Sequence, residues 1–253
     1  MKAKHSRKNH PLSYTARTYR LMHQSGLVSS SVRMKETDLH ILAPISVEDE
    51  AILLVAEVRR QLETYILTHG QFAGSLVPLP MDTAAPEAIR EMLAAGQAAG
   101  VGPMAAVAGI IAEFVGKGLI SSGVEDLIVE NGGDIFIART QECTAAIFAG
   151  QSPLSNKVGI RLTPAMMPCG VCCSSASIGH SLSLGRADAV VVTARSTALA
   201  DAAATRVGNE VDGSPGSLDA ALKVAKGIRG VSGAVVVRDE QLGAWGDIEL
   251  VSL

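Results

Sequence analysis

The stretch that decides the fold is Glu130-Asn131-Gly132-Gly133-Asp134-Ile135, which lies between two short apolar runs of β-type sequence. Two adjacent glycines let the backbone adopt positive φ angles and approach a ligand closely, and Asn131 and Asp134 bring polar groups to the same bend. Asn-Gly between alternating hydrophobic residues is also the strongest short-range signal for a type I′ hairpin. The stretch therefore predicts a tight turn, and both a purely structural hairpin and a ligand-facing loop remain open.

Short β-type runs and helical periodicity continue on both sides of this turn. The predicted strands are 27–35, 38–43, 126–130, 135–140, 143–150, 157–162, 170–175, 189–194, 231–237 and 248–252. The predicted helices are 46–69, capped by Ser46, one that starts at Pro86, and 103–120, 197–208 and 217–226. No linker or internal repeat divides the chain. We therefore predict one α+β domain over residues 21–253, preceded by a flexible basic arm at residues 1–20.

Composition narrows the classes of partner. With 253 residues, of which 47% are hydrophobic and 3% aromatic, the chain can fill a sizeable core and must pack its elements closely on small side chains. A net charge of −3 gives no field that gathers nucleic acid or anionic lipid, so neither is an expected partner. The apolar stretch 98–112 is shorter than a bilayer span and rich in glycine, which predicts a buried helix and no membrane segment.

The four cysteines are Cys143, Cys169, Cys172 and Cys173. They do not form a disulfide framework for a chain of this length, and the basic N-terminus lacks the apolar core of a secretory signal, so we expect a cytoplasmic protein. A zinc site with His180 is a weaker interpretation, because adjacent cysteines on a strand point to opposite faces. Small buried thiols are the favoured interpretation.

Asp201 and Thr205 are the second pair of interest. A helix would place these two residues one turn apart on the same face, since they are four residues apart. Mg²⁺ prefers oxygen ligands and is often held by one or two protein groups together with a substrate phosphate. An Asp in the first turns of a helix is also favoured by the helix dipole alone. Both a cation site and a structural role are compatible with the pattern.

A family resemblance joins these segments. The alanine-rich segment Val101-Gly102-Pro103-Met104-Ala105-Ala106-Val107-Ala108-Gly109, the Asn131–Asp134 turn and Leu199-Ala200-Asp201-Ala202-Ala203-Ala204-Thr205 resemble the ApbE-like superfamily of FAD:protein FMN transferases. The chain looks closest to an uncharacterised branch of that superfamily, and the resemblance covers residues 19–211. It implies a fold related to tunnelling folds, with an antiparallel sheet, helices packed on one face, and self-association as a homo-oligomer such as a dimer.

The resemblance also implies a site. Mg²⁺ would be held by Asp201, Thr205 and a backbone carbonyl near Val107, while Asn131, Gly132, Gly133, Asp134 and Gly109 would shape the FAD-binding site. Asp201 and His180 are the implied catalytic residues. The implied reaction is Mg²⁺-dependent cleavage of the FAD pyrophosphate, with FMN transferred to a Thr of an acceptor protein or to water.

Three departures from the family pattern keep other functions open. Ala108 stands where the transferases carry Lys before the glycine, Glu113 stands in place of an Asp, and the residues 181–185 after His180 differ from the Asp-Pro-x-Thr-Gly run. The alternatives are a non-catalytic protein that binds a flavin or nucleotide and a structural oligomeric scaffold.

Overall fold

The computed structural model describes residues 26–175 and 185–253. Its centre is an eight-stranded sheet with the order β1-β2-β3-β4-β7-β8-β9-β10, and a second sheet has the order β11-β6-β5. Every neighbouring pair of strands is antiparallel. The strands are β1 (Val28–Met34), β2 (Thr37–Ala43), β3 (Leu127–Asn131), β4 (Asp134–Ala138), β5 (Cys143–Ala146), β6 (Val158–Leu162), β7 (Cys169–Ser174), β8 (Ala189–Ala194), β9 (Val231–Arg238), β10 (Gln241–Gly246) and β11 (Glu249–Ser252).

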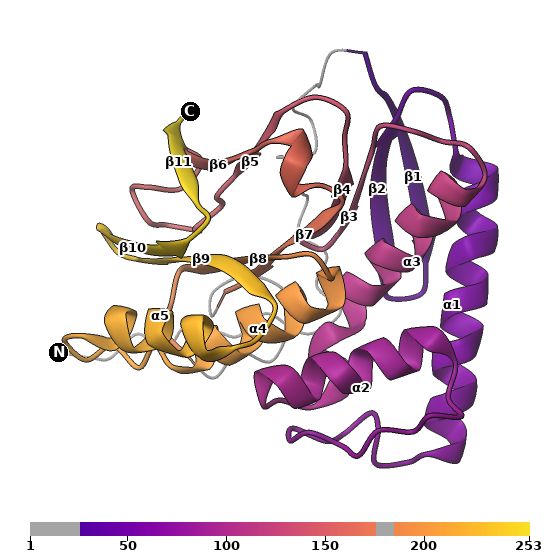
Figure 1. Ribbon diagram of the computed structural model, residues 1–253, viewed down its shortest axis with the longest axis horizontal. Coiled ribbons are helices and arrows are strands. Elements are labelled where there is room, and N and C mark those ends of the chain that lie inside the picture. The colour runs from indigo at the N-terminus through magenta and orange to yellow at the C-terminus, as the bar shows by residue number, and fades with distance from the viewer. Residues whose placement is uncertain (1–25, 176–184) are drawn as a thin grey trace, which may run out of the picture.

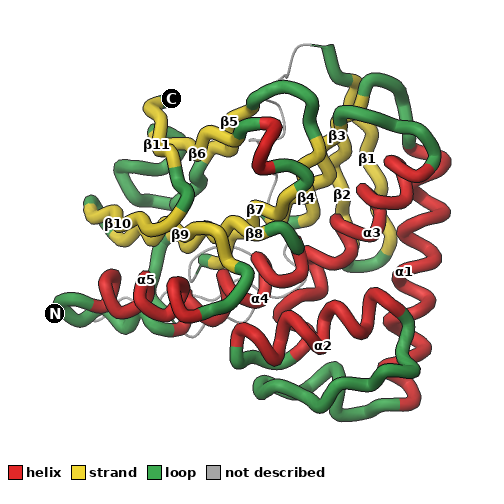
Figure 2. Tube along the Cα trace, viewed as in Figure 1, coloured by secondary structure: helices red, strands yellow, loops and turns green. Residues whose placement is uncertain are grey.

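The helices lie on one face of the large sheet (Figures 1 and 2). They are α1 (Glu48–Thr68), α2 (Glu87–Ala99), α3 (Val107–Ser121), α4 (Thr197–Asn209) and α5 (Ser217–Gly227), and a short 3₁₀ helix, Pro103–Ala106, leads into α3. The small sheet covers part of the opposite face. The prediction of an α+β fold with an antiparallel sheet and helices on one face is confirmed, whereas the separate small sheet was not predicted.

Two hydrophobic cores follow from the alternation of side chains along each strand. In β8, Val190 and Val192 pack towards the helices, while Ala189 and Val191 pack towards the small sheet. Phe136 of β4 faces the helices, and its neighbour Ile137 faces the small sheet. The central strands are therefore apolar on both faces, which is why their sequences read as nearly continuous apolar runs.

Small side chains allow α4 to lie close to the sheet, as the low aromatic content predicts. The alanines at 198, 200, 202, 203 and 204 are at most 1% exposed. A Cβ atom at Gly170 of β7 would lie 2.4 Å from Thr197 Cα, closer than such atoms ever approach. This contact fixes the first turn of α4 directly over β7.

The structure differs from the local predictions at three places. Ser46 does not cap α1, because the residue at the cap position is Val47, whose amide donates instead to the Ser30 hydroxyl over 3.1 Å. Strand β10 was missed because its glycines, Gly243 and Gly246, weaken the β-type pattern. The predicted strand 143–150 ends at Ala146. The predicted basic arm at residues 1–20 lies outside the described residues.

One segment, Pro103–Ser121, is long and apolar enough to cross a membrane by length and composition, with a mean hydropathy of 1.6. Half of it is buried inside the fold, where α3 packs against α1, α4 and β3. Helices in protein cores are commonly this long and apolar, and α3 lies in the core of this fold.

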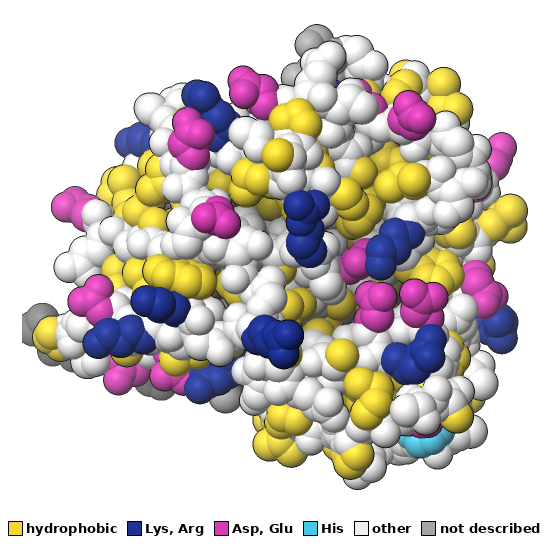
Figure 3. Space-filling view, viewed as in Figure 1, with side chains coloured by type: hydrophobic (Ala, Val, Ile, Leu, Met, Phe, Trp, Pro, Cys, Tyr) yellow, Lys and Arg dark blue, Asp and Glu magenta, His cyan; other side chains and the backbone are white. Residues whose placement is uncertain are grey.

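On the face shown in Figure 3, acidic and basic side chains are interspersed.

Candidate functional site

The Asn131–Asp134 stretch forms the hairpin that joins β3 to β4. Asn131 pairs with Asp134, and the two residues between them, Gly132 and Gly133, have φ angles of 73° and 107°. Positive φ at both central positions is what a type I′ turn requires. The Gly133 amide donates to Glu130 Oε1 over 2.7 Å, which holds the turn. The hairpin prediction is confirmed, with Gly132-Gly133 rather than Asn131-Gly132 at its centre.

Polar side chains on either side of the turn tie it to neighbouring elements. The Asn131 side-chain amide donates to the carbonyl oxygen of Ala108, in the first turn of α3, over 3.1 Å. Asp134 Oδ1 accepts from the amide of Cys173 in β7 over 3.3 Å. Both side chains are less than 10% exposed. The turn is therefore held in place by α3 on one side and by β7 on the other.

Asp201 reaches the same region from α4. Its Oδ2 atom accepts from the Gly109 amide over 2.8 Å, near the N-terminus of α3, where amides lack helical partners. A Cβ atom at Gly109 would lie 2.5 Å from the Thr197 carbonyl oxygen and 2.8 Å from Asp201 Cβ. Only glycine allows this approach of α3 to α4. The two segments singled out in the sequence meet at this contact.

Asp134 lies close enough to Asp201 for its charge to change the pKa of the Asp201 carboxyl group. Burial raises the pKa of Asp201 well above its usual value, and the nearby charge of Asp134 raises it further. Hydrogen bonds from the amides of Gly109 and Ala108 lower the pKa in part. Two carboxyl groups that come together in this way form a place where a cation would relieve the repulsion between them.

The structure brings together four of the predicted site residues: Gly109, Asn131, Asp134 and Asp201. Thr205 lies one turn further along α4 and is partly exposed, and Val107 is the first residue of α3. Within residues 26–175 and 185–253, no three His, Cys, Asp or Glu side chains are grouped as metal ligands. A cation at Asp134 and Asp201 would therefore need further oxygens from backbone, hydroxyl, water or substrate. His180 lies outside the described residues.

Glu113 has a role that the sequence analysis missed. Its Oε2 atom accepts from the amides of Thr197, over 2.7 Å, and Ala198, over 3.2 Å, and its Oε1 atom pairs with Lys117 over 2.8 Å. The side chain is buried, so it anchors the N-terminus of α4 to α3. An acidic residue inside an apolar helix, four residues before a lysine, was the available signal.

The cysteines of β7 point to opposite faces, as the alternation predicts. Cys172 packs with the helices, and Cys173 packs towards the small sheet. Burial raises the pKa of Cys173 to about 12, with a further contribution from the charge of Asp134, and burial raises the pKa of Cys169 to about 11. Both thiols are therefore neutral at physiological pH; Cys169 is buried and Cys173 is half-buried.

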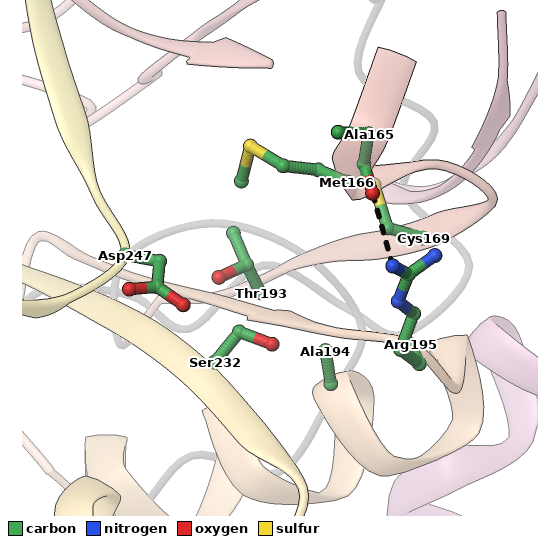
Figure 4. A pocket seen from close by; sticks show the side chains of 8 residues that line it. All are labelled: Ala165, Met166, Cys169, Thr193, Ala194, Arg195, Ser232 and Asp247. Atoms are coloured by element: carbon green, nitrogen blue, oxygen red, sulfur yellow. Dashed lines mark hydrogen bonds between the residues drawn. The ribbon is translucent and has the colours of Figure 1, made fainter. Parts of the chain in front are cut away.

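A separate cavity of about 210 Å³ lies near the start of β7 and the end of β8 (Figure 4). Arg195 stands at one side, where it donates to the carbonyl oxygens of Met167 and Ala165 over 3.1 and 3.0 Å. Asp247 lies on the opposite side of the cavity from Arg195. The lining residues are Ala165, Met166, Cys169, Thr193, Ala194, Arg195, Ser232 and Asp247. None of the predicted site residues that the structure describes lines this cavity, so it is distinct from the site at the glycine turn.

Comparisons with solved structures show the fold. The flavinyl transferase ApbE of Pseudomonas stutzeri, in its apo form, aligns with a TM-score of 0.56 and 16% identity, covering 89% of this chain and 94% of that chain. The flavin transferase ApbE of Vibrio cholerae aligns with a TM-score of 0.50 and 14% identity, covering 87% and 96%. At these identities the likeness concerns the fold alone.

Sequence comparison gives closer relatives. A UPF0280 protein of Methanosarcina acetivorans is 37% identical over 226 residues, which is 89% of each chain. Another, of Methanocaldococcus jannaschii, is 41% identical over 203 residues, or 78% of this chain and 82% of the relative. The model of the family described as "AbpE bacteria" matches residues 20–229. The chain therefore belongs to that family, within the ApbE-like branch that includes the UPF0280 proteins.

Proposed function

We propose that this protein is a Mg²⁺-dependent enzyme that cleaves the pyrophosphate of FAD and transfers FMN to a threonine of an acceptor protein or to water. The observation that carries the proposal is the hydrogen bond between Asp201 Oδ2 and the Gly109 amide, at 2.8 Å. It brings the α4 carboxylate to the N-terminus of α3, which Asn131 also ties to the glycine turn. The names of the two transferases with the same fold support flavin as the substrate class.

The residues at this site suit Mg²⁺. The charges of Asp134 and Asp201 act on each other in a largely buried place, so binding a cation would offset a repulsion that is already present. Both groups offer carboxylate oxygens, the hard ligands that Mg²⁺ prefers, and the small number of protein ligands is typical of Mg²⁺ sites completed by substrate phosphates. When bound, Mg²⁺ would neutralise charge on the pyrophosphate and polarise it. Thr205 and the Val107 carbonyl remain the proposed additional ligands.

The chain's own part is positioning. Gly132 and Gly133 keep the turn free of side chains, so that a phosphate group can approach the backbone. Asn131 and Glu130 hold the turn, and Glu113 holds α4 at the correct depth beside α3. Phosphoryl transfer depends mainly on such positioning and on charge neutralisation, and it requires no protein nucleophile. His180 remains a proposed catalytic group.

The wider proposal concerns partners and setting. The acceptor would be a separate protein that presents a threonine hydroxyl, and the enzyme would work in the cytoplasm as a homo-oligomer such as a dimer. All four cysteines are free thiols, which agrees with a reducing compartment. Residues 21–253 are proposed to act as a single domain.

The direct test is to incubate the purified protein with FAD and MgCl₂ and to quantify AMP and FMN by chromatography. We expect AMP release that requires Mg²⁺ and that Asp201→Ala abolishes. Asp219→Asn, in the exposed first turn of α5, is the matched control and should retain full activity. Absence of AMP, both with and without candidate acceptor proteins, would overturn the proposal.

A non-catalytic flavin-binding protein is the second candidate, and Ala108 favours it. The position carries no cationic side chain that could contact a phosphate, and its backbone carbonyl accepts a hydrogen bond from Asn131. In that case FAD would bind and be recovered intact. A structural scaffold would show no stabilisation by FAD or Mg²⁺ at all.

A further inference from the structure

Ser174, the last residue of β7, has a buried hydroxyl group without an evident structural role. The residue is 6% exposed, and within the described part of the chain its Oγ atom has no hydrogen-bond partner. Burying a hydroxyl without a partner destabilises a fold, because the group loses its hydrogen bonds to water. Such an atom in a folded protein calls for an explanation, and a bound ligand is one.

The position of Ser174 relative to the glycine turn follows from the strand register. Ile135 of β4 pairs with Val171 of β7, and Asp134, the first residue of β4, accepts a hydrogen bond from the Cys173 amide. A Cβ atom at Gly133 would lie 4.0 Å from Cys173 Cβ, which confirms that the turn and the end of β7 are neighbours. Ser174 therefore lies level with the turn.

The side chain of Ser174 shares the sheet face on which Asp201 lies. Side chains two residues apart on a strand point the same way, so Ser174 follows Cys172, whose Sγ lies 3.4 Å from the Thr197 carbonyl oxygen of α4. Asp134 lies on this face too, because it is two residues from Phe136 on β4, and Phe136 packs with the helices. The hydroxyl thus belongs to the helix-side surface that carries both carboxylates.

Helix α4 runs over β7 towards Ser174. Its start lies over Gly170, and four strand residues from there to Ser174 span about 13 Å. The Thr197 carbonyl oxygen lies 3.4 Å from Cys172 Sγ. Burial raises the pKa of the Cys172 thiol, and the charge of Asp201 raises it further. Helix α4 therefore passes over Cys172, which is two residues before Ser174 on the same face of β7.

We propose that Ser174 is a binding residue of this site, whose hydroxyl donates a hydrogen bond to a phosphate oxygen of the dinucleotide on the glycine turn. The inference rests on the proposed function and adds a residue that recognises the pyrophosphate. Asp134 and Asp201 accept hydrogen bonds when ionised, whereas a phosphate needs donors. The Gly133 amide already donates to Glu130, whereas the Ser174 hydroxyl has no partner among the described residues, so a phosphate oxygen could accept a hydrogen bond from it.

The chain offers a matched control. Ser217, the first residue of α5, is also buried, at 4% exposed, and its hydroxyl also lacks a partner among the described residues. It lies at the start of a helix that packs against β9 and β10, away from the glycine turn. Ser174→Ala and Ser217→Ala therefore remove the same group from the same kind of environment, and only the first removes it from the proposed site.

The experiment measures the affinity of both variants and of the wild-type protein for FAD, for ADP and for riboflavin, each with MgCl₂, by calorimetry. We expect Ser174→Ala to weaken binding of FAD and ADP about fivefold, as for the loss of one hydrogen bond, and to leave riboflavin binding unchanged. Ser217→Ala should bind all three as the wild type does. The melting temperatures of both variants without ligand should be unchanged or higher. Ser174→Cys, a weak donor of similar size, should bind with intermediate affinity.

Equal affinity of Ser174→Ala and the wild type for FAD and ADP would overturn the inference, as would failure of the wild type to bind either nucleotide. An equal loss of riboflavin binding would also overturn it, because riboflavin carries no phosphate. If FAD binds in a Ser174-dependent way but no AMP forms, the proposed cleavage fails and this inference stands. If AMP forms at the wild-type rate and KM in Ser174→Ala, this inference alone fails.

Discussion

Asp134 and Asp201 are the two carboxyl groups of the proposed cation site. One carboxylate comes from a strand and the other from a helix, and each is tied to a backbone amide, those of Cys173 and Gly109. These hydrogen bonds orient the two carboxyl groups. A bound cation would relieve the repulsion between them.

The substitution Asp134→Asn tests the repulsion between Asp134 and Asp201. The change removes a charge that faces Asp201, so we expect the melting temperature without Mg²⁺ to stay the same or to rise. The stabilisation by Mg²⁺, about 2.7 kcal/mol at a concentration of 100 times Kd, should disappear. Thermal melts with and without MgCl₂ measure both effects, with Asp219→Asn as the control. Full Mg²⁺ stabilisation of Asp134→Asn would contradict the assignment.

Two thiols with raised pKa values predict a loss of stability at alkaline pH. Cys173 and Cys169 have pKa values raised to about 12 and about 11 by burial, whereas a thiol in an unfolded chain titrates near pH 8.5. Above about pH 8.5 the unfolded chain releases protons that the folded chain still holds, so stability is fully present below that pH and falls as the pH rises towards 11. Urea unfolding between pH 7 and 10.5 measures the slope. Cys173→Ala should show a shallower decline, and an identical slope would refute this origin.

At the scale of elements, the contact between the first turn of α3 and the first half of α4 determines the site. Gly109 sets the distance between the two helices, and Glu113, one turn further along α3, binds the first amides of α4. Ser196 caps the same helix end by accepting from the Leu199 amide over 3.2 Å. These contacts fix the position of α4. They therefore also fix the backbone position from which the Asp201 side chain extends.

Substituting alanine for two glycines of α3 separates this close contact from helix propensity. Gly109→Ala would place its methyl group against the backbone of Thr197, and we expect a loss of about 1–3 kcal/mol together with the loss of Mg²⁺ binding. Gly118→Ala meets only the flexible end of Leu54 and gains up to about 1 kcal/mol of helix propensity. Chemical denaturation of both variants compares them. If both variants were equally stable, the proposed role of Gly109 would be wrong.

For the whole molecule, the large sheet separates two cores and presents the site at one end of its central strands. The turn between β3 and β4, the end of β7 and the N-terminus of α3 meet there, and α4 covers the helix side. Chain segments from widely separated parts of the sequence form this place. A ligand that binds there should therefore stabilise the entire fold.

The expected outcome is a synergy between FAD and Mg²⁺. FAD alone should shift the melting temperature only slightly, because its pyrophosphate would face two carboxylates, and FAD with Mg²⁺ should give a shift larger than the sum of the separate shifts. Differential scanning fluorimetry with FAD, MgCl₂ and both together tests this. Strictly additive shifts would show that the metal and the nucleotide do not share a site.

The sequence by itself determined the local structure around this site. Gly132-Gly133 permits a turn with positive φ angles, the alternation along β7 separates Cys172 from Cys173, and the alanines of α4 allow close packing. These features depend on backbone conformation and on residues near in the sequence, which is why they could be predicted, and the family followed from the same segments.

Only the tertiary structure decided what these residues touch. The bond from Gly109 to Asp201, the proximity of Asp134, the capping of α4 by Glu113 and the buried hydroxyl of Ser174 all join residues that are distant in sequence. Ser46 is a local prediction that failed. The sequence predicted it as the cap of α1, but Val47 occupies the cap position and its amide donates to the Ser30 hydroxyl. The physical reason is that packing fixes which helix end or strand end lies beside which carboxylate, and one sequence pattern is compatible with several such neighbours.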